Sequence, residues 1–339
     1  MKAAAITAPG VVEIVERPEP VAHDDLVVVR ILVAPMCTEH KDRKAGNLSD
    51  SLGHEAAGVV VDAGRSHRVA VGDRVVVMPQ FGCGRCRYCT SGEHIYCPFP
   101  RDVLGETGQS YGTATYTEYV LKPDWLLLPV PDGMSLAHAA AACCLLGPSF
   151  TAHQRMNVQA TDSVLVAGCG PVGLGAVIHG RARGAEVLAL ETHPYRVELA
   201  EKLGARVLDP FDPTLSETVR ELTDGWGVDA SIETSGVAAN PSVLAGLSAR
   251  RARMAVIAWG NEITLPPLVP LGLEIHGCWH WNHQVHAPRM LATIAANTTL
   301  LDTAITHRFA LEDVSAAMDL QDTGRCGKVF LLPFGEEEL

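Results

Sequence analysis

Four cysteines lie close together in the run C-G-R-C-R-Y-C-T-S-G-E-H-I-Y-C, at Cys83, Cys86, Cys89 and Cys97. Four thiolates so close in sequence can converge on one tetrahedral metal ion, and zinc is the usual occupant. A site closed by four protein ligands leaves no position for a substrate. We therefore expect this segment to stabilise a loop rather than to react. Two disulfides, or free thiols in a core, are the alternatives.

A second set of metal-binding side chains is more dispersed. Cys37 follows the apolar run L-V-V-V-R-I-L-V-A, and His54 and Glu55 lie in S-L-G-H-E-A-A-G. A thiolate and an imidazole at strand ends are suitable zinc ligands. Taken alone, however, one Cys and one His belong more often to a core than to a metal site.

A glycine-rich turn follows an apolar run in V-L-V-A-G-C-G-P-V-G, where Gly168, Gly170 and Gly173 flank Pro171 and Val172. In a dinucleotide-binding turn the first glycine permits the tight bend, the second lets the backbone approach a pyrophosphate, and the third lets helix and strand pack closely. The helix that follows then points its N-terminus at the phosphates. The motif alone is weak evidence, but its place between a strand and a helix supports it.

An acidic residue, Glu191, ends the next expected strand about 20 residues further on, where a carboxylate can accept hydrogen bonds from the adenosine ribose. Its charge would repel a 2′-phosphate, so NAD is favoured over NADP. Glu191 can also be read as an ordinary exposed acid at a strand end, and the nearby Arg196 keeps NADP as an alternative.

The composition excludes several classes of protein. The 339 residues are enough for two domains, and 19% charged with 47% hydrophobic residues describes a globular chain. The net charge of −12 without a basic stripe argues against nucleic acid and anionic membrane as partners. Ten cysteines without an evident secretory signal point to a reducing compartment, so we expect a cytoplasmic protein.

The character of the chain changes along its length. Residues 1–125 contain short Val-rich runs separated by glycines, which predicts a mainly antiparallel β domain. A helical stretch follows at residues 136–146. From Ser163, strands alternate with helices, which predicts a doubly wound parallel sheet. We expect strands at 163–168, 186–191, 206–208, 228–233, 255–260 and 273–277, and helices at 171–183, 194–203, 215–223 and 241–250. The last strand, G-K-V-F-L-L-P, has no following helix and is free to return to the first domain.

These motifs together resemble a zinc-containing medium-chain dehydrogenase/reductase of the alcohol and polyol dehydrogenase family. The resemblance spans nearly the whole chain: the Cys37 strand, G-H-E-A-A-G at 53–58, V-G-D-R-V at 71–75, the four-cysteine lobe, the glycine turn and G-K-V at 327–329. It implies an α/β protein with a GroES-like, mainly β catalytic domain and a Rossmann cofactor domain. The implied bounds are 1–148 with the lobe at about 81–100, then 149–285 for the cofactor domain, and 286–339 for a return to the catalytic domain.

The resemblance also assigns roles. Cys37 and His54 would bind a catalytic zinc, Glu55 would lie beside it as a second-sphere or exchangeable ligand, and the four-cysteine lobe would hold a structural zinc. The family's third ligand is a Cys, Glu or Asp near the start of the linker. One register places Leu146 there, which cannot bind metal; counting back from the glycine turn gives Cys144, which we prefer, with Cys143 as the adjacent alternative.

Two stretches depart from the family. Where it usually has a Ser or Thr hydroxyl that begins a proton relay, this chain has Glu39. That carboxylate could accept the alcohol proton, contact a substrate, or be solvated. An entrance edged by Glu39, His40, Asp42 and Lys44 would suit a polar substrate.

The second departure is H-G-C-W-H-W-N-H-Q-V-H-A-P, residues 276–288. The aromatic and polar side chains from Trp279 to His283 could form a wall for a sugar-like ring, pack at an interface, or lie on the surface. Cys169, Cys278 and Cys326 are read as small buried hydrophobes.

The resulting hypothesis is an oxidoreductase with two zincs per chain and NAD. It would oxidise a secondary alcohol of a polyol, sugar or aminocyclitol, or reduce the matching ketone, as a homodimer or homotetramer. The alternatives are an NADPH-dependent carbonyl reductase of a biosynthetic pathway and, at lower weight, a non-catalytic homologue that binds zinc and dinucleotide.

Overall fold

The computed structural model describes residues 1–258 and 268–338, and the chain forms two compact units. The first unit comprises Met1–Cys143, Asn282–Ala295 and Ile305–Leu339, and the second comprises Cys144–Trp281 and Ala296–Ala304. The three-part division expected from the sequence, with bounds at 148/149 and 285/286, stays a prediction.

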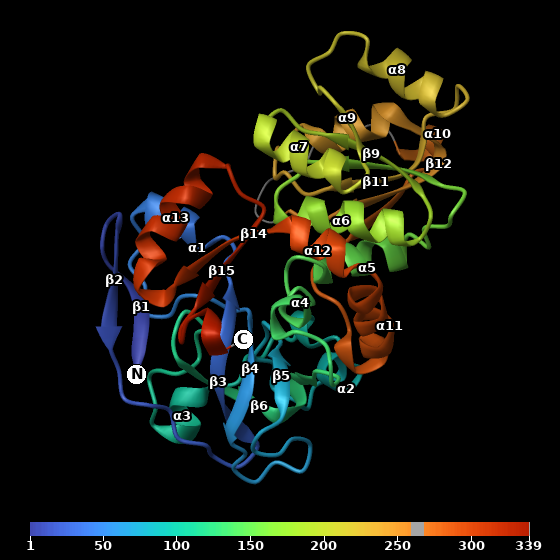
Figure 1. The fold of residues 1–339 in the computed structure, drawn as a ribbon. Coiled ribbons are helices and arrows are strands. Elements are labelled where there is room, and N and C mark those ends of the chain that lie inside the picture. The colour runs from blue at the N-terminus through green and yellow to red at the C-terminus, as the bar shows by residue number, and fades with distance from the viewer. Residues whose placement is uncertain (259–267, 339) are drawn as a thin grey trace. The chain divides into compact units, whose positions relative to one another are not determined.

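The first unit is built mainly from strands (Figure 1). Its elements are β1 (Lys2–Ala8), β2 (Val11–Glu16), β3 (Leu26–Pro35), α1 (Glu39–Ala45), β4 (Ala56–Asp62), β5 (Arg74–Val77), α2 (Arg87–Thr90), η1 (His94–Tyr96), α3 (Val103–Thr107), β6 (Tyr119–Pro123), η2 (Asp124–Leu126), β7 (Leu127–Pro129), α4 (Leu136–Ala140), α11 (His283–Ala296), β14 (Ile305–Ala310), η3 (Leu311–Asp313), α13 (Val314–Thr323), β15 (Lys328–Leu332) and η4 (Glu336–Glu338).

Strand β3 is the centre of the larger sheet of this unit. The strand order is β14-β15-β3-β4-β5-β7, and β6 also pairs with β3. The sequence of β3, L-V-V-V-R-I-L-V-A-P, is rich in β-branched residues and nearly all of it is buried, as expected for a strand with neighbours on both edges. Because β3 ends at Pro35, the chain leaves the sheet immediately before Cys37.

The second unit alternates strands and helices. Its elements are α5 (Gly147–Arg155), β8 (Ser163–Ala167), α6 (Pro171–Ala182), β9 (Glu186–Leu190), α7 (Pro194–Lys202), β10 (Arg206–Leu208), α8 (Leu215–Leu222), β11 (Val228–Glu233), α9 (Asn240–Leu247), β12 (Ser248–Val256), α10 (Leu268–Leu271), β13 (Glu274–Gly277) and α12 (Thr298–Ala304).

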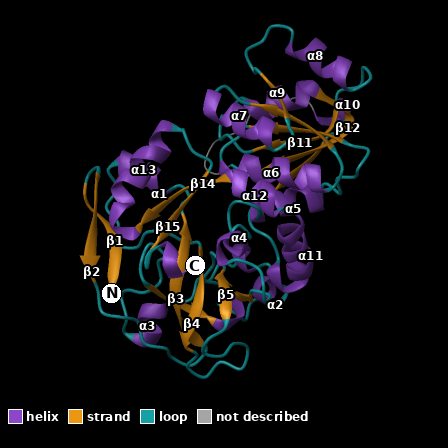
Figure 2. Cartoon of the chain, viewed as in Figure 1, coloured by secondary structure: helices purple, strands orange, loops and turns teal. Residues whose placement is uncertain are grey.

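All strands of the second unit pair in parallel, in the order β10-β9-β8-β11-β12-β13. One side of the sheet is covered by helices that contact one another, α5, α6, α7 and α12 (Figure 2). Helices α8 and α9 pack against each other. This order is that of a dinucleotide-binding fold, in which ligands bind at the carboxyl ends of the strands where the order reverses, here between β8 and β11. The expected α/β class, with a doubly wound parallel sheet, is confirmed.

Most expected elements of the second unit are present within a residue or two. The exception is the helix expected at 241–250, which ends at Leu247 because Ser248 already begins β12, a strand held between β11 and β13. The strand expected at 255–260 therefore begins earlier than predicted. Its last two residues, Trp259 and Gly260, lie outside the described part of the chain. The helical stretch expected at 136–146 ends at Ala140, and turns follow at 141–146.

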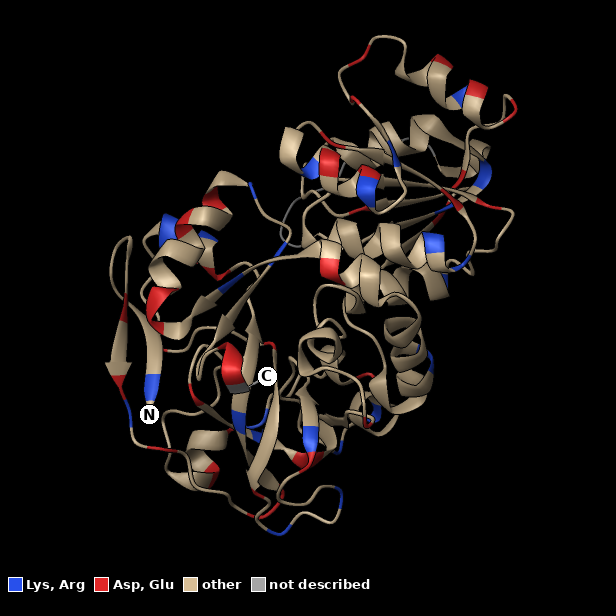
Figure 3. Cartoon of the chain, viewed as in Figure 1, with Lys and Arg blue, Asp and Glu red and all other residues tan. Residues whose placement is uncertain are grey.

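The final strand returns to the first unit, as expected: β15 pairs with β3. Charged residues of both signs are interspersed, as on α7 and α8 (Figure 3). None of the helices in the described ranges combines the length and the apolar character that crossing a bilayer requires.

Candidate active site

The backbone of Cys37 is hydrogen-bonded through both its N–H and its carbonyl. Its N–H lies 3.1 Å from the hydroxyl of Tyr116 and 3.2 Å from Oε2 of Glu39. Its carbonyl accepts a hydrogen bond from Nε2 of Gln321 at 3.1 Å. These contacts come from a loop and two helices far apart in the sequence, and together they hold the backbone of Cys37 in place.

His54 reaches the same place from the opposite strand. It lies just before β4, and its Nδ1 is 2.7 Å from Oε1 of Glu39. Its Nε2 is 3.9 Å from Oε1 of Glu55. The side chain is 36% exposed, so the imidazole remains accessible.

Glu55 is completely buried and pairs with Lys328 of β15, whose Nζ lies 2.6 Å from Oε1. Burial raises the pKa of Glu55 to about 7, although the Lys328 charge opposes the increase. The Gly-Lys-Val motif near the end of the chain thus supplies the counter-charge for this glutamate. Nothing in the sequence identified Lys328 as that partner.

Donor atoms of Cys37, His54, Glu55 and Cys144 all lie within 4.8 Å of one another. In the chain Cys144 follows Cys143, the last residue of this segment of the first unit. Two thiols, an imidazole and a carboxylate form a donor set that suits zinc. The structure therefore brings together the ligands that the sequence suggested, and their metal-binding role stays a proposal.

The alternatives to Cys144 fit less well. The thiol of Cys143 faces the carbonyl of Val77 at 3.5 Å, and burial raises its pKa. Leu146 is fully buried and has no donor atom. Of the candidates at the start of the linker, Cys144 is the one whose sulfur belongs to the group.

The four lobe cysteines also form one group, with Sγ atoms within 4.8 Å of one another. The Sγ of Cys86 lies 3.7 Å from that of Cys89 and 3.6 Å from that of Cys97. All four thiols are free, so the disulfide alternative is not what the structure shows. The donor set fits a closed structural zinc site.

The aromatic stretch after β13 contacts this lobe. Nδ2 of Asn282 donates to the carbonyl of Ser91 at 2.8 Å, and the ring of His283 lies 5.2 Å from that of His94. Trp281 and His280 are buried in the second unit, where Trp281 packs 5.7 Å from Phe150 between ring centroids. Of the roles considered for residues 279–283, these contacts favour packing over a wall for substrate.

The glycine turn lies between β8 and α6, with Gly168 at φ +88°. A Cβ on Gly170 would meet no heavy atom of the described residues within 4 Å, so they leave room for a ligand at this backbone. A Cβ on Gly173 would overlap the carbonyl of Gly168, which explains the third glycine. Pro171 begins the helix, followed by Val172.

Glu191 faces the glycine turn. Its Oε2 accepts a hydrogen bond from the N–H of Cys169 at 2.9 Å, and its Oε1 accepts from the N–H groups of Thr192 and His193. Arg196 lies in the first turn of α7, and its buried Nε has no hydrogen-bond partner among the described residues. An acidic and a basic side chain, Glu191 and Arg196, thus lie after the end of β9, where dinucleotide-binding folds recognise the adenosine ribose.

Three of the four polar residues expected at the entrance, Glu39, His40 and Asp42, are engaged by the protein. Glu39 is bonded to His54, and Nδ1 of His40 lies 2.8 Å from Asp322 of α13. Asp42 accepts from Asn47. These contacts give no support to a polar substrate edge on α1.

Comparison with known proteins decides the family. Residues 22–132 match the alcohol dehydrogenase GroES-like domain, and residues 171–296 match the zinc-binding dehydrogenase family. The chain is 32% identical to an L-threonine 3-dehydrogenase of Symbiobacterium thermophilum, over 84% of this chain and 81% of the relative. The chain belongs to the zinc-containing alcohol dehydrogenase family. It is therefore an oxidoreductase that acts on CH–OH groups.

Two further members of the alcohol dehydrogenase family match almost end to end. A sorbitol dehydrogenase of Bacillus subtilis is 29% identical over 98% of this chain and 97% of its own. The solved alcohol dehydrogenase of Thermus sp. ATN1 is 25% identical, with a TM-score of 0.87 over 98% of this chain and 99% of that chain. The GroES-like and Rossmann domains predicted from the sequence are confirmed.

Proposed function

We propose that this chain is an NAD-dependent dehydrogenase with two zincs, which oxidises a secondary alcohol of a polar, polyhydroxylated small molecule such as a polyol, sugar or aminocyclitol. The observation that carries the proposal is the group formed by Cys37, His54, Glu55 and Cys144. The sorbitol dehydrogenase and L-threonine 3-dehydrogenase relatives act, by their names, on substrates with hydroxyl groups. That likeness now supports a polar substrate better than the residues of α1 do.

In this proposal Cys37, His54 and Cys144 hold the catalytic zinc, and Glu55 lies beside it. Zinc, when bound, acts as a Lewis acid that lowers the pKa of a coordinated hydroxyl group. The protein's part is to fix the donors: Cys37 through its backbone, His54 through Glu39, and Glu55 through Lys328. Cys83, Cys86, Cys89 and Cys97 hold the structural zinc.

For the cofactor, Gly168, Gly170 and Gly173 with Pro171 and Val172 form the pyrophosphate turn, and Glu191 selects NAD. The backbone N–H groups that donate to Glu191 keep its carboxylate at the ribose end of the turn. Arg196 favours a second candidate, an NADPH-dependent carbonyl reductase, because its buried Nε has no partner among the described residues. We further propose a cytoplasmic homodimer or homotetramer.

The test combines metal content with turnover. Zinc per chain is measured on the same samples in which NAD and NADP reduction is followed with polyols, sugars, aminocyclitols and L-threonine. Wild type is expected to hold about two zincs per chain and to reduce NAD with at least one polyhydroxylated substrate. Two zincs with reduction of NADP alone would support the second candidate.

The ligand assignment is tested with three variants. We expect Cys144→Ser to lose about one zinc per chain and all turnover, whereas Cys143→Ser keeps both zincs and its activity. Cys86→Ser should also lose about one zinc, but at a cost to stability rather than to the chemical step. Full zinc content and activity in Cys144→Ser would refute the assignment.

A further inference from the structure

Glu39 is one of the most completely engaged side chains near the metal-binding group. It begins α1, two residues after Cys37, and its side chain is only 11% exposed. Its Oε1 lies 2.7 Å from Nδ1 of His54. Its Oε2 accepts from the hydroxyl of Tyr116 at 2.7 Å and faces the N–H of Cys37 at 3.2 Å. Both oxygens are thus bonded to the protein.

Tyr116 completes the arrangement from a different segment. It is fully buried just before β6, and its carbonyl accepts from the N–H of Ala4 at 2.8 Å. Its hydroxyl donates to Glu39 and lies 3.1 Å from the N–H of Cys37, from which it accepts. One hydroxyl therefore connects the carboxylate to the backbone of a proposed zinc ligand.

The contact between Glu39 and His54 decides which imidazole nitrogen carries the proton. A carboxylate accepts, so Nδ1 of His54 carries the proton and Nε2 keeps its lone pair. Nε2 is also the nitrogen that lies 3.9 Å from Glu55, another member of the metal-binding group. A carboxylate behind a ligating histidine orients the ring and increases its basicity.

We propose that Glu39 and Tyr116 are positioning residues of the catalytic metal site: Glu39 holds His54 with Nε2 directed at the zinc, and Tyr116 holds Glu39 and Cys37 in register. The proposal rests on the proposed function, because it presupposes zinc at Cys37, His54 and Cys144. It also replaces the roles considered from the sequence, since a carboxylate bonded through both oxygens is not free to take a proton from the substrate.

A carboxylate suits this position because it accepts hydrogen bonds only, and the groups that face it from His54, Tyr116 and the backbone of Cys37 are donors. A neutral amide at this position could instead donate to Nδ1, which would place the proton on Nε2 and block metal binding there.

The first test is Glu39→Gln, read by competition between protein and a fluorescent zinc chelator. We expect the dissociation constant of the catalytic zinc to rise about 10–100-fold, while the lobe zinc is unaffected. Glu39→Asp keeps the charge and should recover part of the affinity. The matched control is Asp42→Asn on the same helix, whose carboxylate contacts Asn47 and not the metal-binding group; its zinc affinity should equal that of wild type.

The second test removes a single oxygen with Tyr116→Phe, which keeps the ring packing. Because part of the effect of Tyr116 passes through Glu39, the double variant should lose less zinc affinity than the sum of the losses in the two single variants. In the cobalt-substituted proteins, the visible absorption bands of the catalytic site should shift in both single variants and not in Asp42→Asn.

The outcomes separate this proposal from the proposed function. Two zincs in wild type with unchanged affinity and cobalt spectrum in Glu39→Gln would overturn the positioning role alone, and a fall in kcat in that variant would return Glu39 to the substrate. Additive losses in the double variant would overturn the role of Tyr116. If Glu39→Gln does not fold, an unchanged affinity and spectrum in Tyr116→Phe would overturn the proposal. If wild type holds only the lobe zinc, the proposed function itself fails.

Discussion

Gly53 shows how closely one backbone position is tied to the metal-binding group. It precedes His54, and its φ of +84° lies in the left-handed region that favours glycine. A Cβ here would overlap the ring of Tyr116 and approach Oγ1 of Thr115 at 2.7 Å. The glycine of the G-H-E motif is therefore required by both conformation and space.

These two requirements can be separated experimentally. Gly10 has a similar φ of +80°, but a Cβ there would meet no heavy atom within 4 Å in the part of the chain that the structure describes. We expect Gly10→Ala to lower the free energy of unfolding by about 1–2 kcal/mol, the cost of a left-handed alanine. Gly53→Ala should lower it by at least about 3 kcal/mol and also weaken zinc binding, because Tyr116 must move. Urea unfolding and chelator competition measure the two effects; equal losses in both variants would contradict the role of the Tyr116 contact.

For individual residues, the sequence predicts the metal-binding side chains better than it predicts the residues that hold those side chains in place. Cys37, His54 and Cys144 are recognisable because few residue types bind zinc and a family pattern orders them. Glu39 was recognised as unusual, but its partner Tyr116 is 77 positions away in the chain. Tyrosines beside strands are ordinary, and nothing local marks one that bonds a carboxylate. The pairing of Glu55 with Lys328 was hidden for the same reason.

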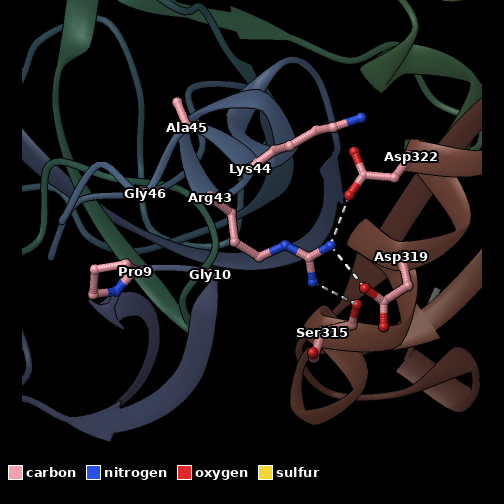
Figure 4. Close-up of a pocket in the computed structure, with 9 residues that line it drawn as sticks. All are labelled: Pro9, Gly10, Arg43, Lys44, Ala45, Gly46, Ser315, Asp319 and Asp322. Carbon is pink, nitrogen blue, oxygen red and sulfur yellow. Dashed lines mark hydrogen bonds and ion pairs between the residues drawn. The ribbon is translucent and has the colours of Figure 1, made fainter.

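Helix α13 supports α1 and the Cys37 loop from the side. Nη2 of Arg43 lies 2.7 Å from Asp319 and 2.8 Å from Asp322, and Nη1 donates to the carbonyl of Ser315 (Figure 4). Residues of the two helices, with Pro9 and Gly10, line an open cavity of about 590 Å³. The Arg43 side chain is only 8% exposed. These contacts of Arg43 with α13 hold α1, the helix that carries Glu39.

The two aspartates that pair with Arg43 should contribute unequally to the free energy of unfolding. Asp322 contacts both Arg43 and His40 and its side chain is 25% exposed. Among the described residues Asp319 forms an ion pair with Arg43 alone, and its side chain is 69% exposed. We expect Asp322→Asn to lower the free energy of unfolding by about 1–2 kcal/mol and Asp319→Asn by less than about 0.5 kcal/mol. Urea titrations of the two variants at neutral pH make the comparison, and an equal or larger loss for Asp319→Asn would refute this ranking.

Element boundaries followed from local signals where those signals exist. Pro171 and Pro194 mark helix starts, and the predicted helices α6 and α7 begin at those residues. The boundary between α9 and β12 was missed because S-A-R-R-A-R is as suitable for a helix as for a strand. Pairing with β11 and β13 decides it, and Arg251 takes a φ of +64° where the register shifts. Such pairing is not visible in a single segment.

For the molecule as a whole, buried histidines couple stability to pH. His153 and His179 are fully buried in the second unit, with ring centroids 5.8 Å apart. Nδ1 of His153 lies 2.8 Å from the carbonyl of Ser149. Burial, with the neighbouring charge of Arg183, lowers the pKa of His153 to about 3. Burial, with His153 and Arg183 as neighbours, also lowers the pKa of His179. Both histidines are therefore neutral in the folded protein at neutral and mildly acidic pH.

The sign of the effect follows from proton uptake. An unfolded histidine binds a proton near pH 6.5, but the folded His153 does not until about pH 3, so the unfolded state binds more protons between these values. The contribution of His153 to the free energy of unfolding is therefore fully present well above pH 6.5, and it falls as the pH decreases through this window. Between pH 7.5 and 5.5 one such histidine removes about 1.3 kcal/mol from the free energy of unfolding.

His153→Gln tests this coupling. Urea unfolding at pH 7.5 and 5.5 should show that the variant loses about 1.3 kcal/mol less than wild type over this interval. His67→Gln, at an exposed position, is the control and should lose as much as wild type. Zinc released at low pH is common to the three proteins and cancels in the comparison. An identical pH dependence in His153→Gln and wild type would show that this buried histidine does not set the acid stability, and the buried His179 would then be the next to replace.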